Sequence, residues 1–189
     1  TLNYAACAAQ AARLWAPYDA EKAENYLKSA IEAYEAYEKY WYDYDDSTTI
    51  HPEMNTDCPK EELNETSQYA PMWQAKTGTP YADNEVKDDA YWAACEIFVS
   101  ASEMGESKLA EKYKAILSDT DYSFDVTTRI YNGYGHYGDY TSFRWDETAS
   151  AGSLTLSLHN DLLSEKEAEK VNNSILEAAD DYLNMEAEQ

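Results

Sequence analysis

Six stretches of the chain have the spacing of apolar residues that is typical of α-helices, and they are of two kinds. In the first kind nearly every side is apolar, which predicts helices that are buried on both sides. In the second kind one apolar stripe lies opposite Glu and Lys, as with Ala23, Leu27, Ala30 and Tyr34. The first kind comprises residues 2–15, 86–102 and 147–159, and the second comprises residues 20–42, 107–117 and 165–184.

Signals for helix ends support these six stretches. Asp19 and Ser164 stand where N-caps are expected, and Ser164 forms an S-x-x-E capping box with Glu167. Gly105 separates the third and fourth predicted helices, as a helix-ending glycine does. The two kinds alternate strictly, which is the order that helical hairpins give when buried helices form an inner ring and amphipathic helices wrap it. The sequence therefore predicts an all-α chain that covers about three hairpins of an α/α toroid of the barrel type.

Two long stretches without helical spacing interrupt the pattern, at residues 43–85 and 119–146. Loops of this length in a compact domain are usually functional or disordered. Both are rich in Tyr, Trp and Asp, and both precede a stretch of the buried kind. We therefore expect them to emerge at the same end of the ring and to form the rim of a cleft. The 189 residues fit one domain, so residues 1–189 are predicted to form a single, partial toroid.

The charge balance excludes two classes of partner. The chain has 37 Asp and Glu against 14 Lys and Arg, a formal charge of −23, which argues against binding to nucleic acid or to an anionic membrane. Its 18 Tyr against 3 Phe are a second unusual feature. Tyr combines an apolar ring with a polar tip and suits stacking on sugar rings, although compositional drift in an acidic proteome would also explain the excess. No stretch approaches the roughly 18 apolar residues of a membrane span.

Cysteine and histidine give little indication of chemistry. Three cysteines exclude a complete disulfide framework, and Cys7 and Cys95 lie in alanine-rich helical stretches where we expect them to be buried. The three histidines have neither zinc-ligand nor nucleophile spacing, and only His136, in a Tyr- and Gly-rich loop, is a plausible cleft residue.

Acidic residues gather ahead of the third predicted helix. Four acids lie within the seven positions from Asp83 to Asp89, and the adjacent pair Asp88 and Asp89 is more crowded than stabilisation by the helix dipole requires. Oxygen ligands at this density suit calcium, and a solvated helix start is the alternative. Asp146 occupies the corresponding position before the next buried helix. In a toroid it would lie near the acidic pair, although it would equally serve as an N-cap.

Three segments in order along the chain resemble glycoside hydrolase family nine, the (α/α)6-barrel cellulases. The opening TLNYAACAAQAARLWAPYD is similar to the family's alanine-rich helix followed by Pro-Tyr-Asp. The segment PYADNEVKDDAYWAACEIF resembles its Tyr-x-Asp and Trp-Ala-Ala-x-Glu-Leu segment, and FRWDETASAGSLTLSL resembles its later Trp-Asp helix with a glycine. The resemblance therefore covers nearly the whole chain.

The resemblance implies a secreted enzyme that hydrolyses β-1,4-glucan with inversion, in which an Asp activates water and a Glu protonates the leaving oxygen. The family carries these two residues in an Asp-Ala-Gly-Asp motif and in an Asn-Glu motif near the end of the domain. Neither occurs here at a corresponding place, because Asn84-Glu85-Val86 copies the letters of the second motif but lies in the acidic segment. The resemblance thus implies the middle of a catalytic domain, with no catalytic residue in this chain.

Residue by residue, the resemblance implies two sets of site residues, while Trp92 is expected to lie in the core. Calcium would be held by Asn84, Glu85, Asp88, Asp89 and Asp146, and sugar would be contacted by Tyr81, Asp83, His136 and Trp145.

Two alternatives stay open at this point: a non-catalytic carbohydrate-binding or scaffold module, and another α/α-toroid carbohydrate enzyme such as an epimerase or lyase. The expected partners are β-glucan and either the remainder of the catalytic domain or another copy. A partner protein is expected because three hairpins alone leave apolar flanks uncovered.

Overall fold

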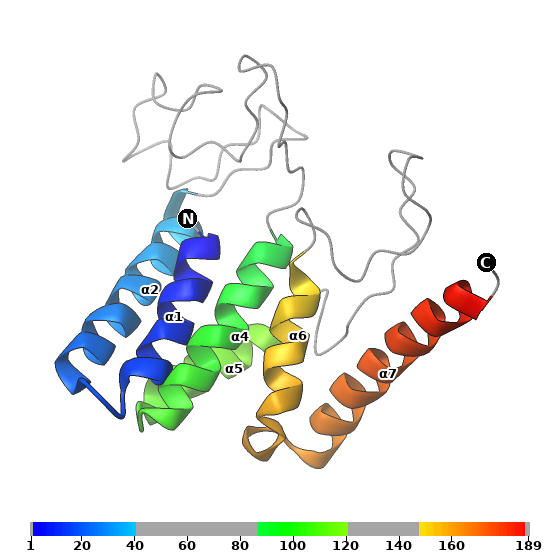
Figure 1. The fold of residues 1–189 in the computed structure, drawn as a ribbon. Coiled ribbons are helices and arrows are strands. Elements are labelled where there is room, and N and C mark those ends of the chain that lie inside the picture. The colour runs from blue at the N-terminus through cyan, green and yellow to red at the C-terminus, as the bar shows by residue number, and fades with distance from the viewer. Residues whose placement is uncertain (1, 41–86, 121–147, 188–189) are drawn as a thin grey trace.

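The computed structural model describes residues 2–40, 87–120 and 148–187, which form helices and the short turns between them (Figure 1). The described part of the chain contains no strand, so the predicted all-α class is confirmed. The α-helices are α1 (Leu2–Trp15), α2 (Ala20–Tyr40), α4 (Lys87–Glu103), α5 (Ser107–Ser118), α6 (Ala149–Leu158) and α7 (Glu165–Ala187), and the 3₁₀ turn η2 spans Asn160–Leu162.

All six predicted helices are present, and their ends differ from the prediction by three residues or fewer. The predicted end signals are also found. The Asp19 carboxylate accepts a hydrogen bond from the Lys22 amide at 3.0 Å, and Gly105 adopts the left-handed conformation with φ of 79°. Glu167 accepts hydrogen bonds from the Ser164 amide at 2.7 Å and from its hydroxyl at 2.8 Å, which forms the predicted capping box.

The helices form three hairpins whose first members lie in a row (Figure 1). The helices α1, α4 and α6 run side by side in the same direction, and α4 contacts both of its neighbours. The returning helices cover this row: α2 packs on α1 and α4, α5 packs on α4, and α7 packs on α6. The alternation of buried and amphipathic stretches therefore corresponds to an inner row and an outer layer, as predicted. The described helices α4 and α6 begin at the end of the molecule where α2 finishes.

The centre of the core is α4, because it has neighbours on nearly every side. Residues 90–101 of this helix are all buried except Trp92, which is half-buried. The buried rings of Tyr34 in α2 and Tyr113 in α5 pack edge to face with their centroids 5.1 Å apart. Burial raises the pKa of both phenols. The Tyr113 hydroxyl is buried and has no hydrogen-bond partner among the described residues.

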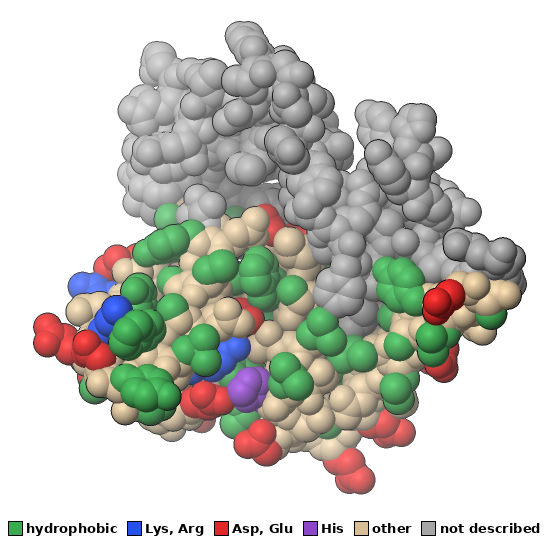
Figure 2. Space-filling model, viewed as in Figure 1, with side chains coloured by type: hydrophobic (Ala, Val, Ile, Leu, Met, Phe, Trp, Pro, Cys, Tyr) green, Lys and Arg blue, Asp and Glu red, His purple; other side chains and the backbone are tan. Residues whose placement is uncertain are grey.

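The expectation that the stretch 2–15 is buried on both sides is only partly correct. Cys95 is buried, and burial raises the pKa of its thiol, but Cys7 is exposed and the prediction for it was wrong. Cys7 lies on a face of α1 that no described helix covers, together with Tyr4 and Leu14, which are 57% and 62% exposed. The helix α7 likewise exposes large apolar side chains, so apolar surface lies open on both flanks of the described helices (Figure 2). No described helix is long and apolar enough to cross a membrane.

Candidate functional site

The acidic pair of the first turn of α4 meets the residue that precedes α6. The Thr148 amide donates a hydrogen bond to Asp88 Oδ2 at 2.6 Å, and the Thr148 hydroxyl donates to Asp89 Oδ1 at 2.7 Å. Residues about sixty positions apart in the sequence thus bring two carboxylates together where two inner helices begin. Sequence reasoning named both acids but missed Thr148.

The structure corrects the alternative role considered for Asp146. The N-cap of α6 is Thr148, so Asp146 does not occupy that position. Thr148 makes no side-chain capping bond to its own helix, because its hydroxyl is directed to the carboxylate of Asp89 instead. The only signal in the sequence was a threonine directly before the small-residue run ASAGS, which is typical of an N-cap but does not reveal a long-range partner.

The environment of the acidic pair favours a positive partner. Asp88 is 1% exposed, and burial raises the pKa of Asp89, an effect that the hydrogen bond from Thr148 partly offsets. The N-terminus of α4 stabilises negative charge here, and carboxylate oxygens are the donors that calcium prefers. The donor chemistry therefore fits calcium. Within residues 2–40, 87–120 and 148–187, however, no three His, Cys, Asp or Glu residues come together as a metal-binding group.

The remaining residues named from the sequence lie outside the described residues. This applies to the metal candidates Asn84, Glu85 and Asp146 and to the sugar-contact candidates Tyr81, Asp83, His136 and Trp145.

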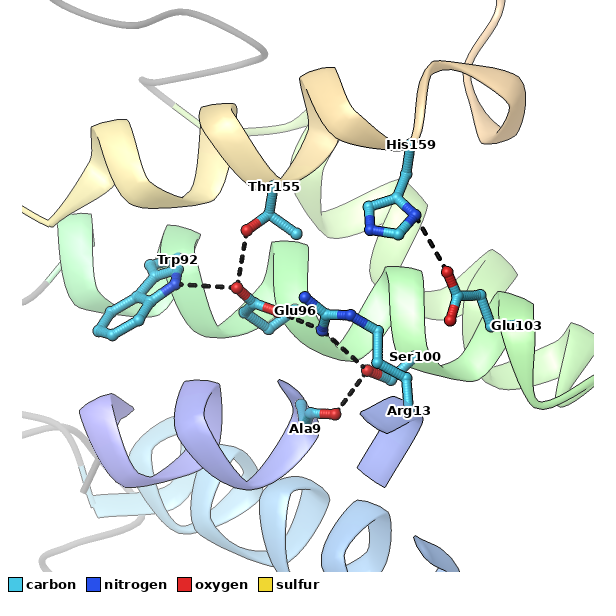
Figure 3. Close-up of polar contacts among 8 residues, drawn as sticks. All are labelled: Ala9, Arg13, Trp92, Glu96, Ser100, Glu103, Thr155 and His159. Carbon is cyan, nitrogen blue, oxygen red and sulfur yellow. Dashed lines mark hydrogen bonds and ion pairs between the residues drawn. The ribbon is translucent and has the colours of Figure 1, made fainter. Parts of the chain in front are cut away.

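A second polar cluster, which sequence reasoning did not find, joins all three inner helices (Figure 3). At its centre is Glu96 of α4, 1% exposed, which forms an ion pair with Arg13 of α1. The Glu96 Oε1 atom accepts hydrogen bonds from the Thr155 hydroxyl of α6 at 2.7 Å and from the Trp92 indole nitrogen at 3.2 Å. Ser100, one turn further along α4, donates to the Ala9 carbonyl at 2.6 Å. A glutamate inside an otherwise apolar helix was the available signal.

One further contact joins the C-terminal ends of two inner helices, whereas the acidic pair lies where α4 begins. His159, which follows α6, places Nδ1 3.0 Å from the Glu103 carboxylate of α4 (Figure 3). This contact joins the C-terminal end of α6 to α4.

The inner helices run parallel, the outer helices return over them, and carboxylates lie where the inner helices begin. This arrangement places the chain in the α/α-toroid class. A family model described as glycosyl hydrolase family 9 matches residues 1–189, and the chain belongs to this family. The family resemblance inferred from the sequence is thereby confirmed.

Two relatives are similar over nearly the whole chain. The chain is 30% identical over 187 residues to the "Cellulose 1,4-beta-cellobiosidase" of Acetivibrio thermocellus. This match covers 97% of the chain and 18% of that protein. The chain is also 30% identical over 190 residues to "Endoglucanase C" of Cellulomonas fimi, and this match covers the whole chain and 13% of that protein. The chain thus spans less than a fifth of the length of either relative.

Proposed function

We propose that this chain is the middle part of the catalytic domain of a secreted, inverting β-1,4-glucanase. The observation that carries the proposal is the match to glycosyl hydrolase family 9 over all 189 residues. The names of the two relatives, a cellobiosidase and an endoglucanase, support a β-1,4-glucan as the substrate. Because such polymers cannot enter a cell, the enzyme that cleaves them acts outside it.

The chemistry requires two carboxyl groups that this chain does not supply in the family's motifs. Inversion places a general acid and a general base roughly 6.5–9.5 Å apart, so that water fits between the base and the sugar. The proposed task of this chain is to build one wall of the cleft. The helices α4 and α6 begin at the same end of the inner row (Figure 1), and Tyr81, Asp83, His136 and Trp145 precede them in sequence. These four residues are proposed to contact the glucan.

Calcium is the proposed structural ion of this wall. Asp88 and Asp89, joined to α6 through Thr148, would hold it together with Asn84, Glu85 and Asp146. Bound calcium would supply positive charge to carboxylates that burial makes costly to ionise. The side chains would in turn fix the beginnings of α4 and α6 relative to each other.

Calorimetric titration of calcium into the chelator-treated, full-length gene product tests the ion site. Asp88→Ala and Asp146→Ala should each abolish binding, whereas Asp161→Ala, which removes an exposed acid of η2, should leave it intact. If calcium binding survives Asp146→Ala, the acids that precede α4 and α6 do not share one ion, and the proposed site is contradicted.

The uncovered apolar faces of the terminal helices indicate what the chain packs against. On α1 and α7, Leu14, Leu176 and Leu183 are each more than 60% exposed. Water contact at so many large apolar side chains is unfavourable. We therefore propose that the remainder of the catalytic domain, or otherwise a second copy, covers these faces.

The activity is tested with the full-length gene product and a panel of neutral polysaccharides. Release of reducing ends from amorphous cellulose, with none from a β-1,3-glucan or from starch, is the expected result. Binding to cellulose without hydrolysis would contradict the proposal and favour the non-catalytic module instead.

A further inference from the structure

Trp92 is the exception on the most buried helix of the molecule. From Ala90 to Ala101 every residue is buried except this one, which is also the largest side chain of the segment. Burying an indole fully would stabilise the fold by about 1.5–3 kcal/mol through its apolar area. Leaving it partly exposed on a buried helix is therefore unfavourable. Trp92 does pack against the core, as expected from the sequence, but its partial exposure indicates that core packing is not its whole role.

The indole is nevertheless held in place. Its nitrogen donates to Glu96 Oε1 at 3.2 Å, and this carboxylate is itself fixed by Arg13 and by Thr155. Trp92 and Glu96 are one turn apart and lie on the same face of α4, between α1 and α6 (Figure 3). The polar atom of the ring is thus satisfied by a buried network that spans three helices, while the residue stays partly exposed. A side chain fixed in this way loses little conformational entropy when it binds a ligand.

The location agrees with a binding role. Trp92 stands one turn after Asp88 and Asp89, close to the beginning of α4, where α6 also begins (Figure 1). By contrast, Trp15 stands at the far end of α1, and the Lys22 ammonium lies 3.4 Å from the centre of its ring. Of these two described tryptophans, only Trp92 combines a fixed ring with a place near the acidic end.

We propose that Trp92 is a sugar-binding platform on which one pyranose ring of the glucan stacks, and that Glu96 is its positioning residue. This inference rests on the proposed function. The C–H bonds of a β-linked glucose point to the two faces of its ring, which makes each face apolar and flat, and an indole offers a matching surface. A neutral sugar also suits a chain with a charge of −23, which would repel an anionic ligand.

The test measures affinity separately from hydrolysis. The full-length gene product and its variants are titrated with a thio-linked cellopentaose, a glucan analogue whose sulfur linkages resist cleavage. We expect Trp92→Leu to weaken binding about tenfold and Trp92→Phe, which keeps an aromatic ring, to weaken it about threefold. Trp15→Leu is the matched control and should bind as the unmodified protein does.

Glu96→Gln tests the positioning role. It should weaken binding in the unmodified background but add nothing to Trp92→Leu, because a residue that acts only through Trp92 has no effect once the ring is absent. Unfolding midpoints of all variants identify losses that come from misfolding, and Trp92→Phe provides the answer if Trp92→Leu does not fold.

Unchanged affinity in a folded Trp92→Leu protein would overturn the inference, as would equal losses for Trp92→Leu and Trp15→Leu. If the unmodified protein binds the thio-linked glucan through Trp92 but hydrolyses no glucan, the proposed function fails while this inference stands. If the unmodified protein hydrolyses amorphous cellulose and Trp92→Leu binds normally, the proposed function stands while this inference fails.

Discussion

The packing of α6 against α4 depends on the absence of a side chain at Gly152. A Cβ atom built there would lie 2.9 Å from Cys95 Sγ, 3.0 Å from Trp92 Cα and 3.2 Å from Tyr91 Cδ1. The second contact is with backbone and cannot be relieved by a rotamer change. Because ordinary contact begins at 3.4 Å, Gly152→Ala requires the two helices to separate by roughly half an ångström.

The cost of Gly152→Ala follows from two opposing effects. Overpacking of a close contact destabilises by about 1–3 kcal/mol. Alanine recovers about 1 kcal/mol because it favours the helix more than glycine does. We therefore expect the free energy of unfolding to fall by up to about 2 kcal/mol, and not to rise by the full gain in helix propensity.

Urea unfolding of the full-length gene product measures this loss. Ala151→Gly, a neighbouring and half-exposed position of α6, calibrates the propensity term and should lower the free energy of unfolding by about 1 kcal/mol. In a Cys95→Ala background Gly152→Ala should be less harmful, because the sulfur contact is gone while the backbone contact stays. If Gly152→Ala raised the free energy of unfolding by the full propensity gain of about 1 kcal/mol, the close contact between α4 and α6 would be refuted.

Further variants test other parts of the packing by their unfolding midpoints. Tyr113→Phe should leave stability unchanged or raise it by up to about 1 kcal/mol, since no described residue pairs with its buried hydroxyl, whereas Tyr91→Phe loses a 3.1 Å hydrogen bond to α6 and should cost about 1 kcal/mol. Glu96→Ala removes the carboxylate that pairs with Arg13, whose side chain is only 9% exposed, and should lower the free energy of unfolding by about 3–5 kcal/mol. Much of this loss should be recovered when Arg13 is also replaced by Met. Partial burial would raise the pKa of Glu167, but hydrogen bonds from its capping partner and a lysine of α5 outweigh it and lower the pKa, so its contribution is present at neutral pH and lost as the pH falls through the carboxyl range. Glu167→Gln should therefore reduce the fall in midpoint between about pH 5 and pH 3, and an unchanged fall would contradict the assignment.

The helices were predictable because their signals are local. Apolar spacing, the capping box and Gly105 each involve residues a few positions apart, and all are found in the structure. The alternation of two helix kinds also indicated which helices form the inner row. The exposure of Cys7 was not predictable, since a pattern that is apolar on all sides does not say which neighbour covers each side.

The polar contacts of the inner helices depend on long-range pairing. Arg13 and Glu96 are 83 positions apart, and Thr148 reaches Asp89 across 59 positions. Sequence spacing indicates that a buried glutamate needs a partner, but it does not identify one without the order of the helices in space. The acidic pair itself was found because its two members are adjacent.

The stereochemistry of cleavage tests the central proposal most directly. The full-length gene product is added to cellohexaose, and proton NMR follows the anomeric signal of the new reducing end during the first minutes. The account predicts that the α-anomer appears first and then mutarotates, because an inverting enzyme converts a β-linkage into an α-product. Initial release of the β-anomer, or no cleavage of cellohexaose, would contradict it.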